Sequence, residues 1–129
     1  MICYLDTSAA MKLLVEEPES DGLTRYLQAG AAEQELVASL LHTELHRAAN
    51  RHPDDIDPDS VGIVLDTVSL IDVIRGDLLT AGTLPGQLRS NAAIHLAAEL
   101  RLSVDEMLTY DAELADPCAA AGLSVEHPV

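Results

Sequence analysis

The chain is poor in aromatic and in basic residues. Among its 129 residues there is no Trp and no Phe, and the only aromatic side chains are Tyr4, Tyr26 and Tyr110. The hydrophobic core must therefore be built from Leu, Ala, Val and Ile. Lys and Arg together number 7 against 22 Asp and Glu, which gives a formal net charge of −15. This balance argues against non-specific binding of nucleic acid through a basic surface.

Long apolar runs and a cysteine framework are also missing. No stretch approaches the roughly 20 apolar residues that cross a membrane, and Met1 leads into a short apolar run without a basic leader. We therefore expect a soluble, cytoplasmic protein with no membrane partner. Two cysteines, Cys3 and Cys118, are too few for a disulfide framework, so we expect small, buried and unpaired side chains. The length fits one domain over residues 1–129.

Short apolar runs alternate with segments of helical periodicity along the whole chain. We expect strands at 2–5, 36–38, 68–71, 106–109 and 123–126. We expect helices at about 9–16, 19–29, 40–51, 61–67, 72–81, 90–101 and 112–119. Thr7 or Ser8 is expected to cap the first helix and Ser90 the sixth. The alternation predicts an α/β fold with a mainly parallel sheet covered by helices on both faces.

Three acids lie either just after a predicted strand or on the apolar face of a predicted helix. Asp6 and Asp111 follow strands directly, and ligands bind outside the carboxyl ends of strands in open α/β sheets. Glu44 shares a helix face with Leu41 and Ala48, where an unpaired carboxylate is costly. Two other interpretations stay open, namely that the aspartates are helix caps and that Glu44 pairs with a buried arginine.

A metal ion would explain acids gathered in one place. Carboxylates about 4 Å apart repel by roughly 4 kcal/mol at an effective dielectric of about 20, so a cluster stays ionised only around a cation. Oxygen ligands suit Mg²⁺ or Mn²⁺. Such an ion can activate water and stabilise charge on a phosphate.

The histidines give a weaker signal. His42 and His46 have a spacing that can hold zinc, but the zincin motif needs Glu where this chain has Thr43. Solvated or partly packed histidines are the favoured interpretation. His95 could face the same site as the acids, and the pattern favours a packing or supporting role for it.

Four segments together carry a family resemblance. They are Y-L-D-T-S-A-A-M-K-L-L-V-E-E-P-E-S at the start, S-L-L-H-T-E-L-H-R-A around Glu44, L-P-G-x-L-R-S-x-x-A-I-H-L-A, and T-Y-D-A-E-L-A around Asp111. In this order, and over nearly the whole chain, they resemble PIN-domain ribonucleases of the VapC toxin family.

The resemblance implies a PIN-like three-layer α/β/α sandwich and a toxin of a type II toxin–antitoxin pair. It implies a Mg²⁺- or Mn²⁺-dependent endoribonuclease that cleaves RNA, such as tRNA or rRNA, to inhibit translation. It further implies a VapB-type antitoxin, a toxin homodimer and a higher assembly with the antitoxin. By resemblance, Asp6, Glu44 and Asp111 are catalytic acids and metal ligands. Residues that could support these acids or contact substrate are Thr7, Ser8, Arg89, His95 and Thr109.

Ala92 stands where the family has its third acid. Its neighbours Arg89, Ser90 and His95 follow the family pattern, so we interpret Ala92 as a substituted aspartate. Deliberate inactivation and natural loss are both open as its origin. The loss of one ligand predicts impaired activity and a weakly occupied or empty metal site.

Two other functions are compatible with parts of the pattern. One is a non-catalytic PIN module that only binds an antitoxin. In either case we expect the antitoxin to lie near the first two helices and the helix after Pro58. The other is a phosphoacceptor signalling domain, which needs paired acids at the first strand and a lysine at the last. Asp6 stands alone and Lys12 is the only lysine, so this second function is disfavoured.

Overall fold

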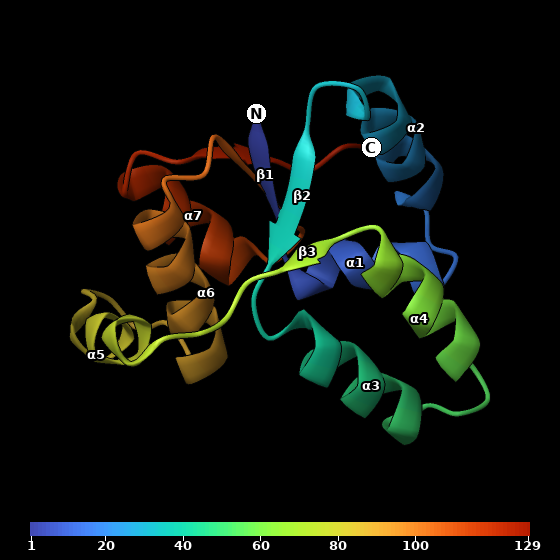
Figure 1. Ribbon diagram of the computed structural model, residues 1–129, viewed down its shortest axis with the longest axis horizontal. Helices are drawn as coiled ribbons and strands as arrows, with labels where there is room; N and C mark the ends of the chain where they lie inside the picture. Colours follow the sequence, from blue (N-terminus) through green and yellow to red (C-terminus); the bar gives the residue numbers. More distant parts are fainter.

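The fold is built on a five-stranded parallel sheet. A computed structural model describes residues 1–129. The strands are β1 (Ile2–Leu5), β2 (Glu35–Ala38), β3 (Ser69–Leu70), β4 (Glu106–Leu108) and β5 (Ser124–Glu126). They lie in the order β3-β2-β1-β4-β5, and every neighbouring pair is parallel (Figure 1). This confirms the expected parallel sheet and places the longest strands at its centre.

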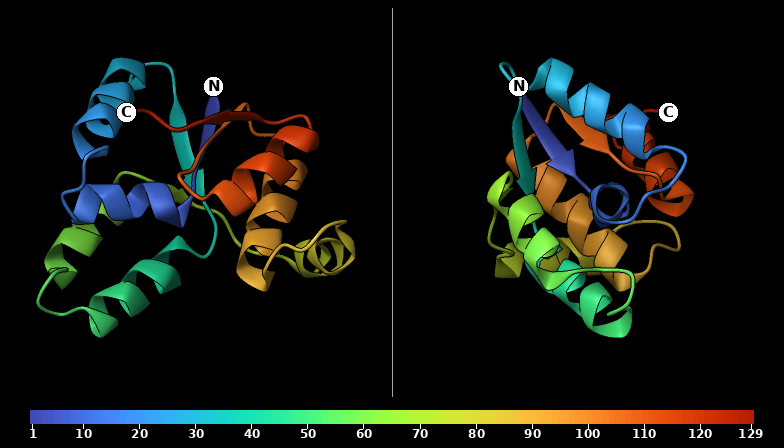
Figure 2. Two further views of the ribbon diagram at one scale, coloured as in Figure 1. Left: turned by 180° about the vertical axis from the view of Figure 1, so that it is seen from behind. Right: turned by 90° about the vertical axis from the view of Figure 1, so that its right-hand side faces the viewer.

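Seven helices cover the two faces of this sheet. They are α1 (Thr7–Leu14), α2 (Ser20–Gly30), α3 (Leu41–Arg51), α4 (Pro58–Asp66), α5 (Arg75–Thr83), α6 (Ser90–Leu102) and α7 (Ala112–Ala120). Helices α1 to α4 lie on one side of the sheet and α6 and α7 on the other, while α5 packs on α6 (Figures 1 and 2). The result is a three-layer α/β/α sandwich, as predicted.

Alternation along β1 shows why both faces need a cover. Cys3 and Leu5 point into the core beneath α1 to α4, whereas Tyr4 points into the core beneath α6 and α7. Successive strand side chains point to opposite faces, and all three are fully buried. A strand with apolar side chains on both faces is stable only between two layers of helices.

The starts of α1, α4 and α6 differ from the expectation, and capping carboxylates set the first two. Asp6, rather than Thr7 or Ser8, is the cap of α1, and its carboxylate accepts from the Ser8 amide. Arg89, rather than Ser90, is the cap residue of α6, and it makes no side-chain capping bond. The carboxylate of Asp57 caps α4, which therefore begins three residues earlier than expected, with proline in its first turn.

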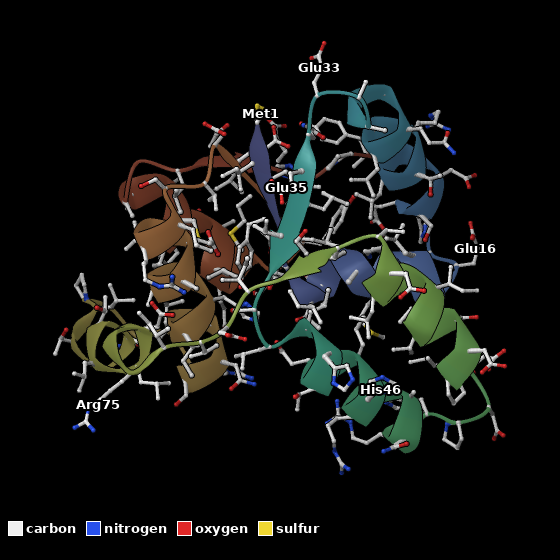
Figure 3. All side chains as sticks on the ribbon, in the orientation of Figure 1. Met1, Glu16, Glu33, Glu35, His46 and Arg75 are labelled. Carbon is white, nitrogen blue, oxygen red and sulfur yellow. The ribbon has the colours of Figure 1, made fainter.

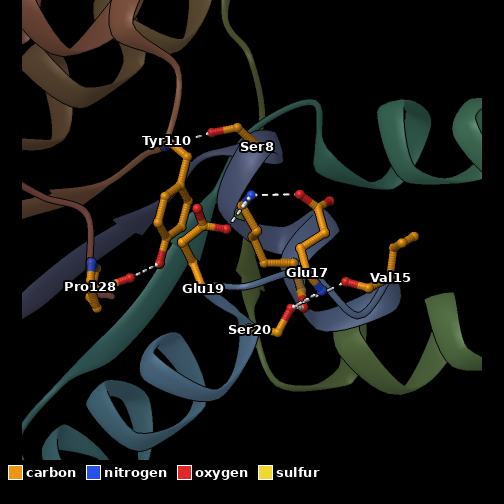
Figure 4. A network of polar contacts seen from close by, with 8 residues as sticks. Ser8, Val15, Glu17, Glu19, Ser20, Tyr110 and Pro128 are labelled. Carbon is orange, nitrogen blue, oxygen red and sulfur yellow. Dashed lines mark hydrogen bonds and ion pairs between the residues drawn. The ribbon is translucent and has the colours of Figure 1, made fainter.

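The three tyrosines each join segments that are distant in sequence. The hydroxyl of Tyr4 bonds to Ser39 and His95, and that of Tyr26 donates to Glu106. The Tyr110 hydroxyl donates to the Pro128 carbonyl, and the Tyr110 amide donates to the Ser8 hydroxyl (Figure 4). Scarce aromatics therefore serve as links between elements as well as filling space.

Two further expectations concern the cysteines and the membrane. Both cysteines are free and buried, as expected, and burial raises their thiol pKa values. None of the helices has the length and apolar character needed to span a bilayer.

Candidate active site

A cavity of about 460 Å³ lies where β1 and β4 end. The predicted acids Asp6, Glu44 and Asp111 line it, and so does Ala92. Its full lining is Asp6, Thr7, Ser8, Glu44, Arg89, Ser90, Asn91, Ala92, His95, Asp111, Glu113 and Leu114. The fold thus brings four segments that are far apart in sequence to one edge of the sheet.

Asp6 is held by three hydrogen bonds that all end on one oxygen. Its Oδ2 accepts from the Ser8 hydroxyl at 2.6 Å, the Thr109 hydroxyl at 2.8 Å and the Ser8 amide at 3.4 Å. Asp6 is 5% exposed, and its Oδ1 has no hydrogen-bond partner in the protein. One oxygen is therefore fixed by the fold, and the other is free to meet a ligand.

Asp111 lies beside Asp6 through a shared threonine. The Asp111 amide donates to the Thr109 hydroxyl at 3.0 Å, and that hydroxyl donates in turn to Asp6. The Oδ1 of Asp111 accepts from the Glu113 amide at 2.9 Å and caps α7. Both aspartates are therefore helix caps, as one interpretation held, and both also line the cavity. Thr109, which is buried, lies behind the acids and outside the cavity lining.

Glu44 is paired with a histidine. Its Oε1 lies 2.6 Å from His95 Nε2, and its side chain is 21% exposed. The expected alternative of a buried pair with arginine is wrong, because no arginine lies within ion-pair distance of Glu44. The Nδ1 of His95 bonds to the Tyr4 hydroxyl at 2.6 Å, which is within 2.6 Å of the Ser39 hydroxyl. A buried polar chain thus runs inward from Glu44.

Position 92 contributes no polar side-chain atom to the cavity. Ala92 lies in the first turn of α6, on the same helix face as His95 and Glu99. Its methyl group packs partly against the core beneath α6 and α7. A longer side chain here would extend into the space shared by the three acids.

Glu99 is a buried acid that the sequence reasoning missed. It is fully buried, its Oε2 lies 3.7 Å from the Cys118 thiol, and its Oε1 has no partner. Burial, and secondarily the charge of Asp6, raises the pKa of Glu99 to about 8. Its spacing from His95 on an apolar helix face was the available signal. At neutral pH this group is mainly a neutral acid beneath the site.

The cavity rim carries two charged residues of opposite sign. Arg89 lines the cavity as predicted, and its Nε lies 3.7 Å from Glu113 Oε2. Both side chains are exposed, so the pair contributes at most about 1 kcal/mol and leaves the guanidinium available. Glu113 was not predicted, although it follows Asp111 by two residues in the first turn of α7.

The side chains that line the cavity are of a kind that binds metal ions, but they are not arranged around an ion. Carboxylate oxygens of Asp6, Glu44 and Asp111 are the ligands that hard cations take. No group of three or more His, Cys, Asp or Glu side chains is arranged to hold an ion, however. Glu44 is turned to His95, and position 92 supplies no oxygen. The donors therefore fit Mg²⁺ or Mn²⁺ in kind, but they do not converge.

The paired histidines on α3 form no centre of their own. The rings of His42 and His46 lie 4.5 Å apart between centroids, and no third ligand joins them. Lys12, the only lysine, bonds to Glu17 and Glu19 and does not line the cavity. The phosphoacceptor interpretation therefore lacks the lysine it requires.

Comparisons with known proteins identify relatives of the chain and similar folds. No family model matches the chain. Ribonuclease VapC46 of Mycobacterium tuberculosis is 36% identical, over 97% of this chain and 96% of the relative, and Ribonuclease VapC47 is 32% identical over the same shares.

Solved structures give the same result for the fold. The VapBC2 structure from Rickettsia felis, bound to a promoter DNA fragment, matches with a TM-score of 0.80 at 15% identity and covers both chains fully. VapC20 of Mycobacterium tuberculosis, a toxin that cleaves the sarcin-ricin loop, matches with a TM-score of 0.66 at 14% identity over 98% of this chain and 99% of that one. From the curated relatives, the chain belongs to the VapC family of PIN-domain toxin–antitoxin ribonucleases.

Proposed function

We propose that this chain is the toxin of a type II pair, a metal-dependent endoribonuclease that cleaves RNA and thereby inhibits translation. The observation that carries the proposal is the single cavity lined by Asp6, Glu44 and Asp111 together with position 92. Family membership supports the ribonuclease activity. The free Oδ1 of Asp6, which faces no protein donor, supports a ligand role for that acid.

Each side chain has a distinct task in this proposal. Asp6, Asp111 and Glu44 would hold Mg²⁺ or Mn²⁺, which when bound activates water and stabilises charge on phosphate. Ser8 and Thr109 orient Asp6 through their hydroxyls. His95 orients Glu44. Arg89 offers a contact to phosphate at the rim of the cavity. Thr7 also lines the cavity.

Ala92 impairs this chain in the proposal. The missing carboxylate removes a direct metal ligand, and loss of mere supporting groups already costs roughly 10–100-fold in affinity or activity. The lack of a converged donor group agrees with weak metal binding by the chain as it stands.

We also propose a VapB-type antitoxin as partner, with homodimers of the toxin in the assembly. Similar structures are toxin–antitoxin complexes. An apolar groove of about 340 Å³ runs between α1, α2 and the start of β2 and includes Leu13, Leu27 and Leu36. Ile63 on α4, in the same layer of helices, is 68% exposed. The charge of −15 favours a basic partner.

Restoring the acid tests the nuclease proposal directly. Ala92→Asp is compared with Ala92→Asn, which adds nearly the same volume without the charge, and RNA 5′ ends are sequenced after expression. We expect cleavage at defined sites with Asp, little with Asn or Ala, and loss of cleavage with chelator. Absence of cleavage by Ala92→Asp with both Mg²⁺ and Mn²⁺ would overturn the proposal.

A second function remains, that of a non-catalytic antitoxin-binding PIN module. The observation in its favour is the unconverged set of acids around Ala92. It predicts that Ala92→Asp and Ala92→Asn are equally inactive while antitoxin binding persists.

A further inference from the structure

A second cavity lies next to the acid-lined one. It has a volume of about 350 Å³ and lies between α1 and α3. Thr7, Glu44 and Asn91 line both cavities, so the two spaces adjoin. The other lining residues are Met11, Thr43, Arg47, Ala48, Arg51 and His52. We call this second cavity the α1–α3 groove.

Two arginines of α3 face the α1–α3 groove together. Arg47 and Arg51 are four residues apart and therefore lie on one side of the helix. At a rise of 1.5 Å per residue they are about 6 Å apart along the helix axis. Thr43, one turn before Arg47, lies on the same side of α3 and extends this stripe of groove-lining residues toward Glu44 and the acids. The stripe thus leads from the open end of the groove to the candidate active site.

Neither arginine has an acidic partner, although the chain carries 22 acids. Lys12, Arg89 and Arg101 each lie near a carboxylate, whereas Arg47 and Arg51 form no ion pair and no side-chain hydrogen bond. Their guanidinium groups therefore keep all their donors available. A free guanidinium matches the geometry of a phosphate group and binds it through two parallel hydrogen bonds.

An unused hydroxyl marks the point where the two cavities meet. Thr7 Oγ1 is buried and has no hydrogen-bond partner in the protein. Buried polar groups are almost always bonded, and this hydroxyl oxygen is covered as it stands, so a rotation of the Thr7 side chain is needed before a ligand in either cavity can bond to it. This observation is independent of the arginines and concerns a residue that lines both cavities.

We propose that the α1–α3 groove binds the backbone phosphates of single-stranded RNA next to the bond that is cut. The proposal rests on the nuclease function proposed above and names where its substrate enters. Only Met11 and Ala48 are apolar among the lining residues, so the groove does not suit an apolar helix of a protein partner. The free arginines would also repel a basic antitoxin.

The composition of the groove also determines what kind of recognition it provides. Proteins that bind single strands combine a basic groove for the backbone with aromatic side chains on which bases stack. No aromatic ring other than that of His52 lines this groove, and phosphate contacts carry no sequence information. The groove therefore contributes affinity and direction, and selection of the cleavage site must come from other contacts.

Charge-matched variants separate a specific groove from general electrostatics. Arg47→Gln with Arg51→Gln removes the two groove arginines. Arg25→Gln with Arg75→Gln removes two exposed arginines that also lack ion pairs and lie on α2 and α5. Arg75 lies at the outer part of α5, well away from α3, where His46 is labelled (Figure 3). Binding of a fluorescent single-stranded RNA is measured by anisotropy at several salt concentrations, with gels confirming intact RNA.

We expect the groove pair to weaken binding at least tenfold and the control pair less than twofold. With about 0.7 released counterions per phosphate contact on a single strand, the salt slope should fall by about 1.4 for the groove pair. Equal losses in both pairs, or no RNA binding by the unaltered chain, overturn the proposal. Tighter binding of a poly-glutamate peptide than of RNA, lost in the groove pair, assigns the groove to an acidic protein segment and also overturns it.

The groove and the nuclease function can fail separately. If Ala92→Asp cleaves RNA and adding the two groove changes leaves its KM unaltered, the groove proposal is wrong and the nuclease stands. If Ala92→Asp fails to cleave while the arginine-dependent RNA binding persists, the nuclease proposal is wrong and the groove stands.

Discussion

His95 Nε2 and Glu44 Oε1 lie 2.6 Å apart and join α6 to α3 across the wall of the candidate active site. The two residues are 51 positions apart in sequence. An ionised carboxylate only accepts hydrogen bonds, so the imidazole donates from Nε2. The pair fixes one oxygen of Glu44 and leaves the other without a hydrogen-bond partner in the protein.

The far side of the imidazole is fixed by Tyr4. The Tyr4 hydroxyl accepts from the Ser39 amide at 3.1 Å and lies 2.6 Å from His95 Nδ1. Burial raises the pKa of the Tyr4 phenol, so it keeps its proton. With Nε2 donating to Glu44, a neutral ring accepts the Tyr4 proton at Nδ1. Tyr4 thereby orients His95, and His95 orients Glu44.

The first prediction concerns His95 as a positioning residue. In the Ala92→Asp background, His95→Leu fills a similar space without a donor, whereas His95→Gln keeps a donor that can reach Glu44. We expect the Leu variant to bind Mn²⁺ roughly 10–100-fold more weakly, as for other groups that orient metal ligands, and the Gln variant to recover part of the loss. Isothermal titration calorimetry with Mn²⁺ measures this without an activity assay. Equal affinity of the Leu variant and its parent would show that Glu44 needs no support.

The second prediction concerns the buried acid Glu99. Its pKa is raised from 4.5 in the unfolded chain to about 8 in the folded protein. Between these values the folded state holds more protons, so stability falls as pH rises through this range and is greatest, for this group, below pH 4.5. The slope reaches at most about 1.4 kcal/mol per pH unit. Burial keeps the neighbouring Cys118 thiol pKa above this range, so it stays neutral.

Glu99→Gln isolates this contribution. The variant keeps a neutral polar side chain of the same shape, so we expect its stability relative to the parent to increase steadily from pH 5 to pH 8. Urea unfolding at several pH values measures the difference. The exposed Glu113→Gln serves as the control, because the side chain of Glu113 is 61% exposed. Parallel pH profiles for the parent and Glu99→Gln would contradict the raised pKa.

The local sequence pattern predicted the sheet well, because a strand that is buried on both faces is a short continuous run of apolar residues. The apolar run around Cys3, Tyr4 and Leu5 predicts a buried strand. Asp6, which follows this strand, could therefore be placed at the edge of the sheet. The fold class and the family were both predicted from such segments and are confirmed. Whether the acids are ligands stays a prediction.

Contacts between side chains that are distant in sequence could not be predicted from the sequence. Nothing local ties Glu44 to His95, or Asp77 to Arg101, which lies 2.8 Å away in α6 and anchors α5. Arg47 and Arg51 line one groove because α3 packs beside α1. Such pairs depend on how helices pack, and a single sequence carries no direct sign of that.

The last prediction concerns the coupling between position 92 and metal. An aspartate in the first turn of α6 gains from the helix dipole, by about 0.3–1 kcal/mol. It also joins Asp6, Glu44 and Asp111 in one cavity, and a single carboxylate within about 4 Å of it would repel it by roughly 4 kcal/mol at an effective dielectric of about 20. Repulsion is the larger effect, so Ala92→Asp should have a lower Tm than the parent in EDTA.

A bound cation removes this repulsion, and any ligand that binds only the folded state raises stability. Millimolar Mn²⁺ should therefore raise the Tm of Ala92→Asp far more than that of the parent or of Ala92→Asn, as measured by differential scanning calorimetry. An equal shift in all three would mean that position 92 takes no part in metal binding, and the cavity would then need another explanation for its acids.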